Sequence, residues 1–150
     1  MKISKLVLPV LVMVAAGGAL ASAQAKKAAK APATPAAKVF FVEPKSGATV
    51  TSPVHMKFGS SGTTISPVPA GDVTTARPGM THYHVGVGVA CLPPGKNIVK
   101  GTPSWVHFGD GKSEIDMQLT PGRHRLALQL GDDLHNTVAG FCSTMTVNVR

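Results

Sequence analysis

Hydrophobic and polar residues alternate strictly over the second part of the stretch 80–91, which reads MTHYHVGVGVAC. Because successive side chains of a β-strand point to opposite faces, this alternation predicts a strand with two different faces. One face is apolar and typical of a core: Tyr83, Val85, Val87, Val89 and Cys91. The other carries His82 and His84, followed by glycines that leave room for another group to approach the backbone. We expect any functional site to include these two histidines.

Similar short segments recur along the chain, separated by turn residues such as Gly, Pro, Asp and Ser. We expect strands at 39–42, 49–51, 53–59, 80–91, 103–108, 113–119, 123–130 and 141–149. Residues 60–79 are rich in Ser, Thr, Gly and Pro and predict a long loop, a feature that is uncommon unless the loop binds something or moves. Together these features predict an all-β fold, an immunoglobulin-like antiparallel β-sandwich of seven to eight strands spanning residues 39–150.

The N-terminus has the composition of an export signal. Residues 1–23 carry Lys2 and Lys5 near their start, continue with an apolar run and end in the small residues Ala-Ser-Ala. This layout predicts a signal peptide cleaved after Ala23, because the apolar run is shorter than the roughly 20 residues of a membrane-spanning helix. Residues 24–38 contain mainly Ala, Pro and Lys and predict a disordered linker. We therefore expect a periplasmic or secreted protein with no transmembrane segment after cleavage.

The net charge of +8 lies mostly outside the predicted domain. From Val39 onward, 9 basic and 7 acidic residues leave a net charge of +2, and the remaining lysines lie in the signal peptide and the linker. This nearly neutral domain gives no support for nucleic-acid binding. The basic linker could contact an anionic component of the cell envelope, but a solubilising spacer is the simpler interpretation.

Two cysteines in an exported chain, Cys91 and Cys142, favour one disulfide. It would close a loop of about 50 residues and stabilise the fold by roughly 4 kcal/mol in the chain-entropy model. The alternative is a reactive or copper-binding thiol. By simple alternation Cys142 points away from the core while Cys91 points toward it, so their pairing requires a bulge near Gly140 or pairing at the end of the sheet.

The H-x-H pattern in the strand expected at 80–91 is compatible with a metal site. His82 and His84 project the same way, with Cα atoms about 6.6 Å apart, so both imidazoles can reach one ion at roughly 2.0–2.1 Å. A hydrated strand face with two histidines explains the pattern equally well. A third ligand must come from elsewhere, and His107 and His135 are the candidates.

Other side chains could complete or support this metal site. Asp132 and Asp133 are candidates for oxygen donors or for hydrogen-bond partners of the ligands. Met56 and Met80 could add sulfur for copper.

The two remaining histidines have structural interpretations. His55 alternates with core residues and predicts an exposed side chain. His124, in the segment LTPGRHRL, occupies the position of the tyrosine whose hydroxyl bonds to the upstream backbone at the corner of immunoglobulin-like sandwiches.

Several segments also resemble a known family. They are 39–59 (VFFVEPKSGATVTSPVHMKFG), 81–84 (THYH), 106–114 (VHFGDGKSE), 119–132 (LTPGRHRLALQLGD) and the following His135. In this order they resemble the bacterial family known as domain of unknown function 4399, over nearly all of residues 39–150. The resemblance implies an exported or periplasmic single domain without an established activity, with histidines at the positions of 81–84, His107, His124 and His135. The family's late loop tends to carry more prolines and a second histidine, which this chain lacks, and the cysteine pair is not typical of the family.

These features leave three functions open. The first is a non-enzymatic periplasmic module that binds copper or zinc through His82, His84 and His107, with His135 in support. The second is an envelope-associated adhesion or interaction module without a metal, which would bind through its loops. The third and most remote is a metalloenzyme similar to copper-zinc superoxide dismutase, whose bridging-histidine pattern is not visible here. No G-x-S-x-G element occurs, and no cysteine nucleophile remains if the disulfide forms, so we expect no enzyme.

Overall fold

The computed structural model describes residues 36–150. This part of the chain contains strands, turns and connecting segments but no helix, which confirms the prediction of an all-β fold. Accordingly, no helix in the described part of the chain is long and apolar enough to cross a membrane. The expected signal peptide, 1–23, and the expected linker up to residue 35 lie outside the described residues.

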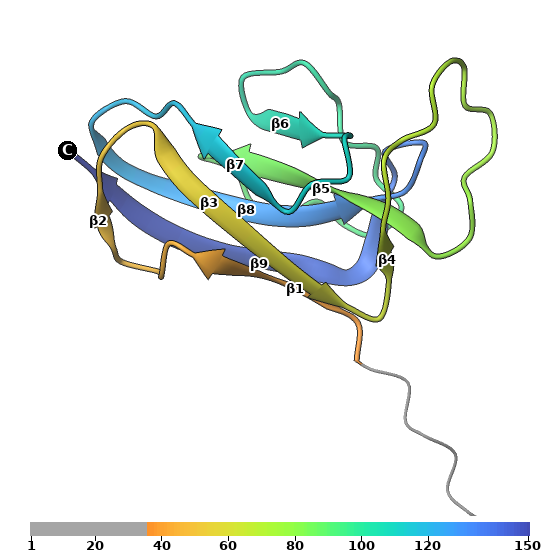
Figure 1. Ribbon diagram of the computed structural model, residues 1–150, viewed down its shortest axis with the longest axis horizontal. Helices are drawn as coiled ribbons and strands as arrows, with labels where there is room; N and C mark the ends of the chain where they lie inside the picture. The colour runs from red at the N-terminus through yellow and green to blue at the C-terminus, as the bar shows by residue number, and fades with distance from the viewer. Residues whose placement is uncertain (1–35) are drawn as a thin grey trace, which may run out of the picture. The chain divides into compact units, whose positions relative to one another are not determined.

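Two sheets form the domain (Figure 1). The strands are β1 (Lys38–Glu43), β2 (Thr49–Val50), β3 (Val54–Ser61), β4 (Thr64–Ile65), β5 (Met80–Val87), β6 (Trp105–Phe108), β7 (Glu114–Met117), β8 (Gly122–Gly131) and β9 (Thr137–Val149). The smaller sheet has the order β1-β3-β7, and the larger has the order β2-β9-β8-β5-β4, with β6 also paired to β5.

The strand count and the pairing differ from the sequence prediction in two details. The two-residue strand β4 lies inside the expected loop 60–79, so nine strands occur in the described residues rather than seven to eight. Two pairs, β2 with β9 and β4 with β5, are parallel rather than antiparallel. Both parallel pairs are two residues long, and their strands are too short to show an alternating pattern in the sequence.

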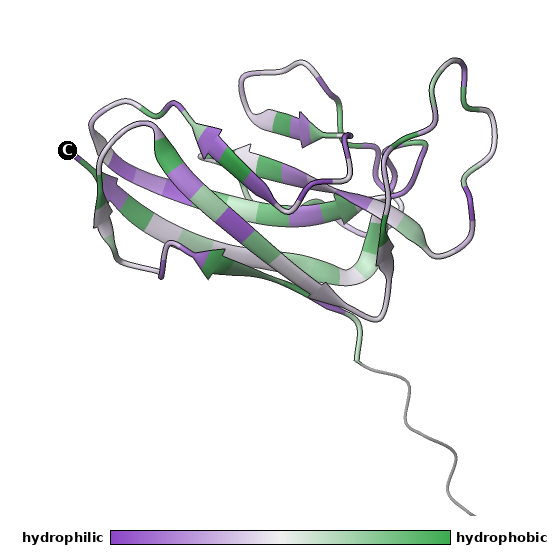
Figure 2. Cartoon of the chain, viewed as in Figure 1, coloured by the Kyte–Doolittle hydropathy of each residue, from purple (hydrophilic) through white to green (hydrophobic). Residues whose placement is uncertain are grey.

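The main core lies between the two sheets, because each contributes the apolar side of an alternating strand. Strand β3 places Val54, Met56 and Phe58 in this core while His55 stays exposed, and alternating colours mark the same strand in Figure 2. Strand β5 contributes Tyr83 and Val85 from the larger sheet. The inward positions predicted from the alternation of these strands are therefore confirmed.

Strand β5 ends earlier than the sequence predicted. It stops at Val87, because Gly88 adopts a positive φ of 71° that turns the chain out of the strand. The expectation that Val89 and Cys91 share the face of Tyr83 is therefore wrong. Both instead pack in a second apolar cluster with Leu92, Ile98, Trp105 and Ala127.

This second cluster covers the opposite face of the larger sheet. A side chain at Gly86, on the same strand face as the two histidines, would collide with Val89 and Trp105 of the cluster. The segment between β5 and β6 thus folds back over the face that carries His82 and His84. Those histidines lie on the side of the sheet away from the main core, where the rings of His107 and His135 pack against them.

The position of Cys91 in the covering segment resolves the mismatch between the cysteines. Cys142 pairs with Gln129 in the β8–β9 ladder and lies on the covered face, as its alternation predicted. The two cysteines lie at disulfide distance, with Cα atoms 6.2 Å apart. Cys142 points away from the main core, as predicted. Cys91 can reach it because Cys91 lies beyond the end of β5, in the segment that covers this face.

Candidate metal centre

Two neighbouring strands and one turn bring four histidines together on the covered face of the larger sheet. His82 and His84 come from β5, and His107 of β6 lies directly opposite His84 in the antiparallel register. His135 comes from the turn that joins β8 to β9. The structure thus brings together all four histidines that the sequence proposed as metal ligands.

Glycines make room for two of the imidazole rings. Gly131 pairs with His82 across β5 and β8, and a Cβ atom there would lie 2.7 Å from the Cε1 atom of His84. A Cβ atom at Gly109 would likewise collide with the ring of His107. Both positions therefore require glycine for steric reasons as long as the histidines keep these orientations.

The turn that carries His135 is held by a hydrogen-bond network. Oδ1 of Asp132 accepts bonds from the backbone N–H groups of Leu134, at 2.9 Å, and Asn136, at 2.8 Å. His135 itself has a positive φ of 66°, a conformation uncommon for any residue except glycine. Its carbonyl oxygen accepts a bond from the Ile98 N–H at 2.8 Å. The covering segment and the Asp132 side chain together hold His135 over β5.

The four imidazoles are close enough to share one ion. One nitrogen from each residue can be chosen so that all four lie within 4.8 Å of one another. The Nε2 atoms of His107 and His135 are 3.0 Å apart. Four nitrogens around a tetrahedral ion, each at about 2.05 Å, would be separated by roughly 3.3 Å. Small side-chain rotations would therefore bring the cluster to the geometry of a metal site.

The two histidines of β5 are buried without hydrogen-bond partners. Their residues are 1% and 0% exposed, and within residues 36–150 no group bonds to Nε2 of His82 or to either ring nitrogen of His84. A buried polar atom without a partner costs about 1–3 kcal/mol, and such atoms are rare in folded proteins. A metal ion fits this position, because its bonds to imidazole nitrogens would remove that cost.

The electrostatic environment keeps these imidazoles neutral. Burial, followed by the neighbouring histidines, lowers the pKa of His84 to about 2, and burial, His107 and His135 lower the pKa of His82 to about 3. The pKa values of His107 and His135 are also lowered, mainly by burial and then by nearby positive charge, including that of Lys100. Neutral imidazole is the form that coordinates metals, so the cluster is ready to bind an ion at neutral pH.

The two acidic residues proposed as oxygen donors have other partners. Asp133 is buried and forms a two-pronged ion pair with Arg77, whose Nε and Nη2 atoms donate to its carboxylate at 2.8 and 2.9 Å. This contact lowers the pKa of Asp133 to about 2. Asp132 caps the turn of His135, as described above. Both carboxylates thus position the cluster from outside it, and neither belongs to the group that could hold the ion.

Arg77 is a residue that sequence reasoning missed. Besides pairing with Asp133, its Nη2 atom donates to the carbonyl oxygen of Pro67 at 2.7 Å, which ties together the two ends of the segment between β4 and β5. An isolated arginine in a Gly- and Pro-rich stretch gives no local signal of such a partner. Only the approach of two segments 56 residues apart creates the contact.

The two methionines and the two other histidines proposed from the sequence differ in where they lie. Met56 is buried in the main core, on the other side of the larger sheet, so the prediction that it could ligate copper is wrong. Met80 shares the strand face of His82, two residues before it. His55 is exposed and pairs with Asp116, and Nε2 of His124 donates to the carbonyl oxygen of Thr120 at 2.7 Å. His55 is therefore exposed as predicted, and His124 makes the predicted bond to the upstream backbone.

Comparison with known proteins gives one family. No curated protein and no solved structure was found to match the chain. The family described as "Domain of unknown function (DUF4399)" matches residues 56–150, a range that includes the four clustered histidines, Arg77 and both cysteines. The resemblance seen in the sequence is thereby confirmed over this range, and the chain belongs to the DUF4399 family.

Proposed function

We propose that this chain is an exported, non-enzymatic protein that binds one copper or zinc ion through His82, His84, His107 and His135. The observation that carries the proposal is the cluster itself: four neutral imidazoles whose ligand atoms lie within 4.8 Å of one another. Two of its members have buried nitrogens with no protein partner in the described range. The folded chain thus creates an arrangement that is costly when empty and favourable when an ion is bound.

The donor set supports copper or zinc over harder cations. Imidazole nitrogen suits zinc and copper, whereas magnesium and calcium prefer oxygen ligands, and both nearby carboxylates are engaged elsewhere. The signal-like residues 1–23 support export. The absence of a nucleophile motif in the sequence supports a binding role rather than catalysis.

Metal analysis of the full mature protein, purified without a histidine tag, tests this function. Calorimetry is expected to show one equivalent of copper or zinc, and His82→Ala should abolish this uptake because a buried ligand is lost. His55→Ala is the matched control, because His55 is exposed and lies outside the cluster. Binding weaker than about 10 μM in the wild type, or equal uptake by His82→Ala, would contradict the proposal.

We also propose that the domain is an immunoglobulin-like sandwich. The sheet orders β1-β3-β7 and β9-β8-β5-β6 correspond to the orders A-B-E and G-F-C-C′ of that fold. The bond from His124, near the start of β8, to the upstream backbone corresponds to the tyrosine corner of strand F. An experimental structure in which β7 paired with the larger sheet would contradict this assignment.

A further inference from the structure

A cavity of about 350 Å³ lies beside the histidine cluster. Three separate segments line it: residues 68, 69 and 71–73 from the connection between β4 and β5, Lys100 from the covering segment, and residues 133–135 from the turn after β8. His135 is the one member of the histidine cluster among its lining residues. A molecule in this cavity would therefore meet a bound ion from the side of His135, while His82 and His84 hold the ion from within.

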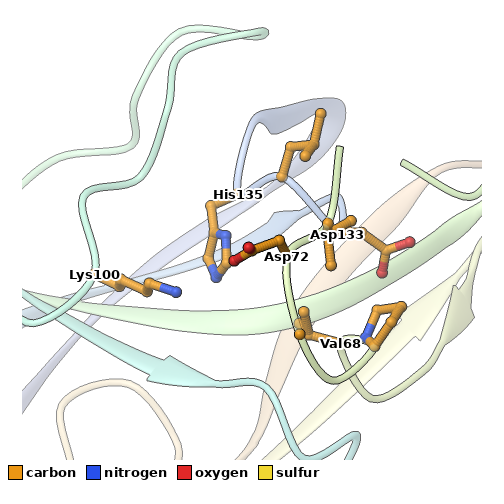
Figure 3. A pocket seen from close by; sticks show the side chains of 9 residues that line it. Val68, Asp72, Lys100, Asp133 and His135 are labelled. Atoms are coloured by element: carbon orange, nitrogen blue, oxygen red, sulfur yellow. The ribbon is translucent and has the colours of Figure 1, made fainter. Parts of the chain in front are cut away.

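The charges around the cavity are distributed unevenly. The carboxylate of Asp133 is neutralised by Arg77, which leaves Lys100 and Asp72 as the other charged lining residues. The Lys100 side chain extends toward the ring of His135 (Figure 3). Within residues 36–150 neither Lys100 nor Asp72 forms an ion pair, so each is available to a ligand.

A metal ion in this cluster would keep its full charge. All four candidate ligands are neutral, and no carboxylate belongs to the group that could hold the ion. A divalent ion together with Lys100 would place three positive charges beside the cavity, against the single charge of Asp72. Because charge in a partly buried site is poorly screened, such a site attracts an anion.

We propose that this cavity binds a small carboxylate anion, which contacts the metal ion through one oxygen and the Lys100 ammonium group through the other. Binding of the anion requires the ion to expand from four to five ligands, an expansion that zinc sites undergo in some enzymes. A volume of about 350 Å³ holds roughly ten water molecules, which suits a small organic acid. The proposal rests on the proposed metal site and names its exogenous ligand.

Titration of the metal-loaded full-length mature protein with acetate tests the inference. The protein is loaded with copper(II), or with cobalt(II) in place of zinc, and the metal's absorption spectrum is followed at constant ionic strength. We expect a saturable spectral change, and Lys100→Met should weaken acetate binding about tenfold while the metal stoichiometry stays at one. Lys96→Met is the matched control, because Lys96 is an exposed lysine of the same segment that does not line the cavity, and it should bind acetate as the wild type does.

The possible results distinguish a failure of the proposed carboxylate site from a failure of the proposed metal site. A wild-type protein that takes up no metal would contradict both proposals. One equivalent of metal with no saturable response to acetate would overturn only the carboxylate site. Equal acetate affinity in Lys100→Met and the wild type would show that the anion reaches the metal by another route, which would also overturn it.

Discussion

The two faces of strand β5 are equally buried but chemically opposite. On one face, Tyr83 and Val85 pack in the main core between the sheets, where burial of apolar surface is favourable in itself. On the other, His82 and His84 are as fully excluded from water, yet three of their ring nitrogens have no partner within the described residues. One strand thus carries a face that stabilises the fold next to a face that costs free energy.

This difference indicates that the segment covering His82 and His84 does more than stabilise the fold. The segment between β5 and β6 builds its own small apolar cluster and carries one half of the cysteine pair. It contacts the turn of His135 through the Ile98 N–H. These contacts exclude water from imidazoles that exposure would have hydrated at no cost, as is expected for a preformed ligand site.

The largest effect on metal binding is expected when a histidine of β5 is replaced by an apolar residue like those on the opposite face of the strand. His84→Leu should abolish binding of one equivalent of metal, because it removes a central ligand, while the metal-free protein should unfold at the same or a higher urea concentration. Calorimetry and urea unfolding measure the two effects. A metal-free variant destabilised by more than about 2 kcal/mol would show that His84 has a structural role in the empty site.

Loss of the cross-link over the histidine face should lower the stability of the fold. The double variant Cys91→Ser/Cys142→Ser should lose about 4 kcal/mol of unfolding free energy, because the cysteines are 51 residues apart and their bond restricts the unfolded chain. Urea unfolding under oxidising conditions measures this loss. An unfolding free energy equal to that of the wild type would contradict a disulfide in the mature protein.

Truncation of the core face should lower stability without affecting the metal. Leu128→Ala, opposite Val85 in the sheet, should cost about 3 kcal/mol in both the metal-free and the metal-loaded protein, because it leaves a cavity in the main core. Unfolding followed with and without metal measures both values. A change in metal stoichiometry in this variant would show that the two faces are coupled.

Acid should destabilise the metal-free protein through the histidine face. The folded-state pKa values of His82 and His84, about 3 and about 2, lie below the ordinary value of 6.5. Above pH 6.5 these imidazoles are neutral in both states, whereas between pH 6.5 and about 3 only the unfolded chain takes up their protons. Stability therefore falls with decreasing pH, by about 1.4 kcal/mol per pH unit for each such histidine.

Urea unfolding of metal-free protein between pH 7 and 4 measures this slope, and His82→Leu/His84→Leu should flatten it. The pKa of Asp133, lowered to about 2 by Arg77, makes stability fall only below its ordinary value of 3.8, so it contributes little in this range. A slope as steep in the double variant as in the wild type would assign the acid sensitivity to other groups.

The smallest effect is expected from a histidine outside the cluster. His124→Ala should cost about 1 kcal/mol of unfolding free energy through the lost bond to Thr120, with no change in metal affinity. Urea unfolding and calorimetry measure both. Reduced metal uptake would show that the corner histidine supports the site.

The sequence predicted the features of this fold that depend on alternation. The faces of β3 and β5, the inward positions of the last strand and the outward phase of Cys142 follow from the two-residue period of strands. The end of β5 was missed because a glycine fits both a strand interior and a turn, and only the positive φ of Gly88 decides between them.

The candidate site could be predicted only in part, because most of its contacts join segments that are distant in the sequence. His82 and His84 share a face by their spacing, but His107 joins them through the register between β5 and β6, which a single sequence does not specify. His135 depends on a turn in an uncommon backbone conformation. Arg77 and Lys100 carry no local signal, because their roles arise from segments that meet only in the folded chain.

X-ray absorption spectroscopy of the zinc-loaded full-length mature protein tests the central claim most directly, because it reports the atoms bound to the ion. The histidine face predicts a first shell of four nitrogens at about 2.0–2.1 Å, with the outer-shell scattering of imidazole rings and no sulfur. Added acetate should contribute one further oxygen to this shell without altering the count of four nitrogens. A first shell with fewer than three imidazoles, or one that contains a cysteine or methionine sulfur, would contradict the claim that these four histidines form the metal site.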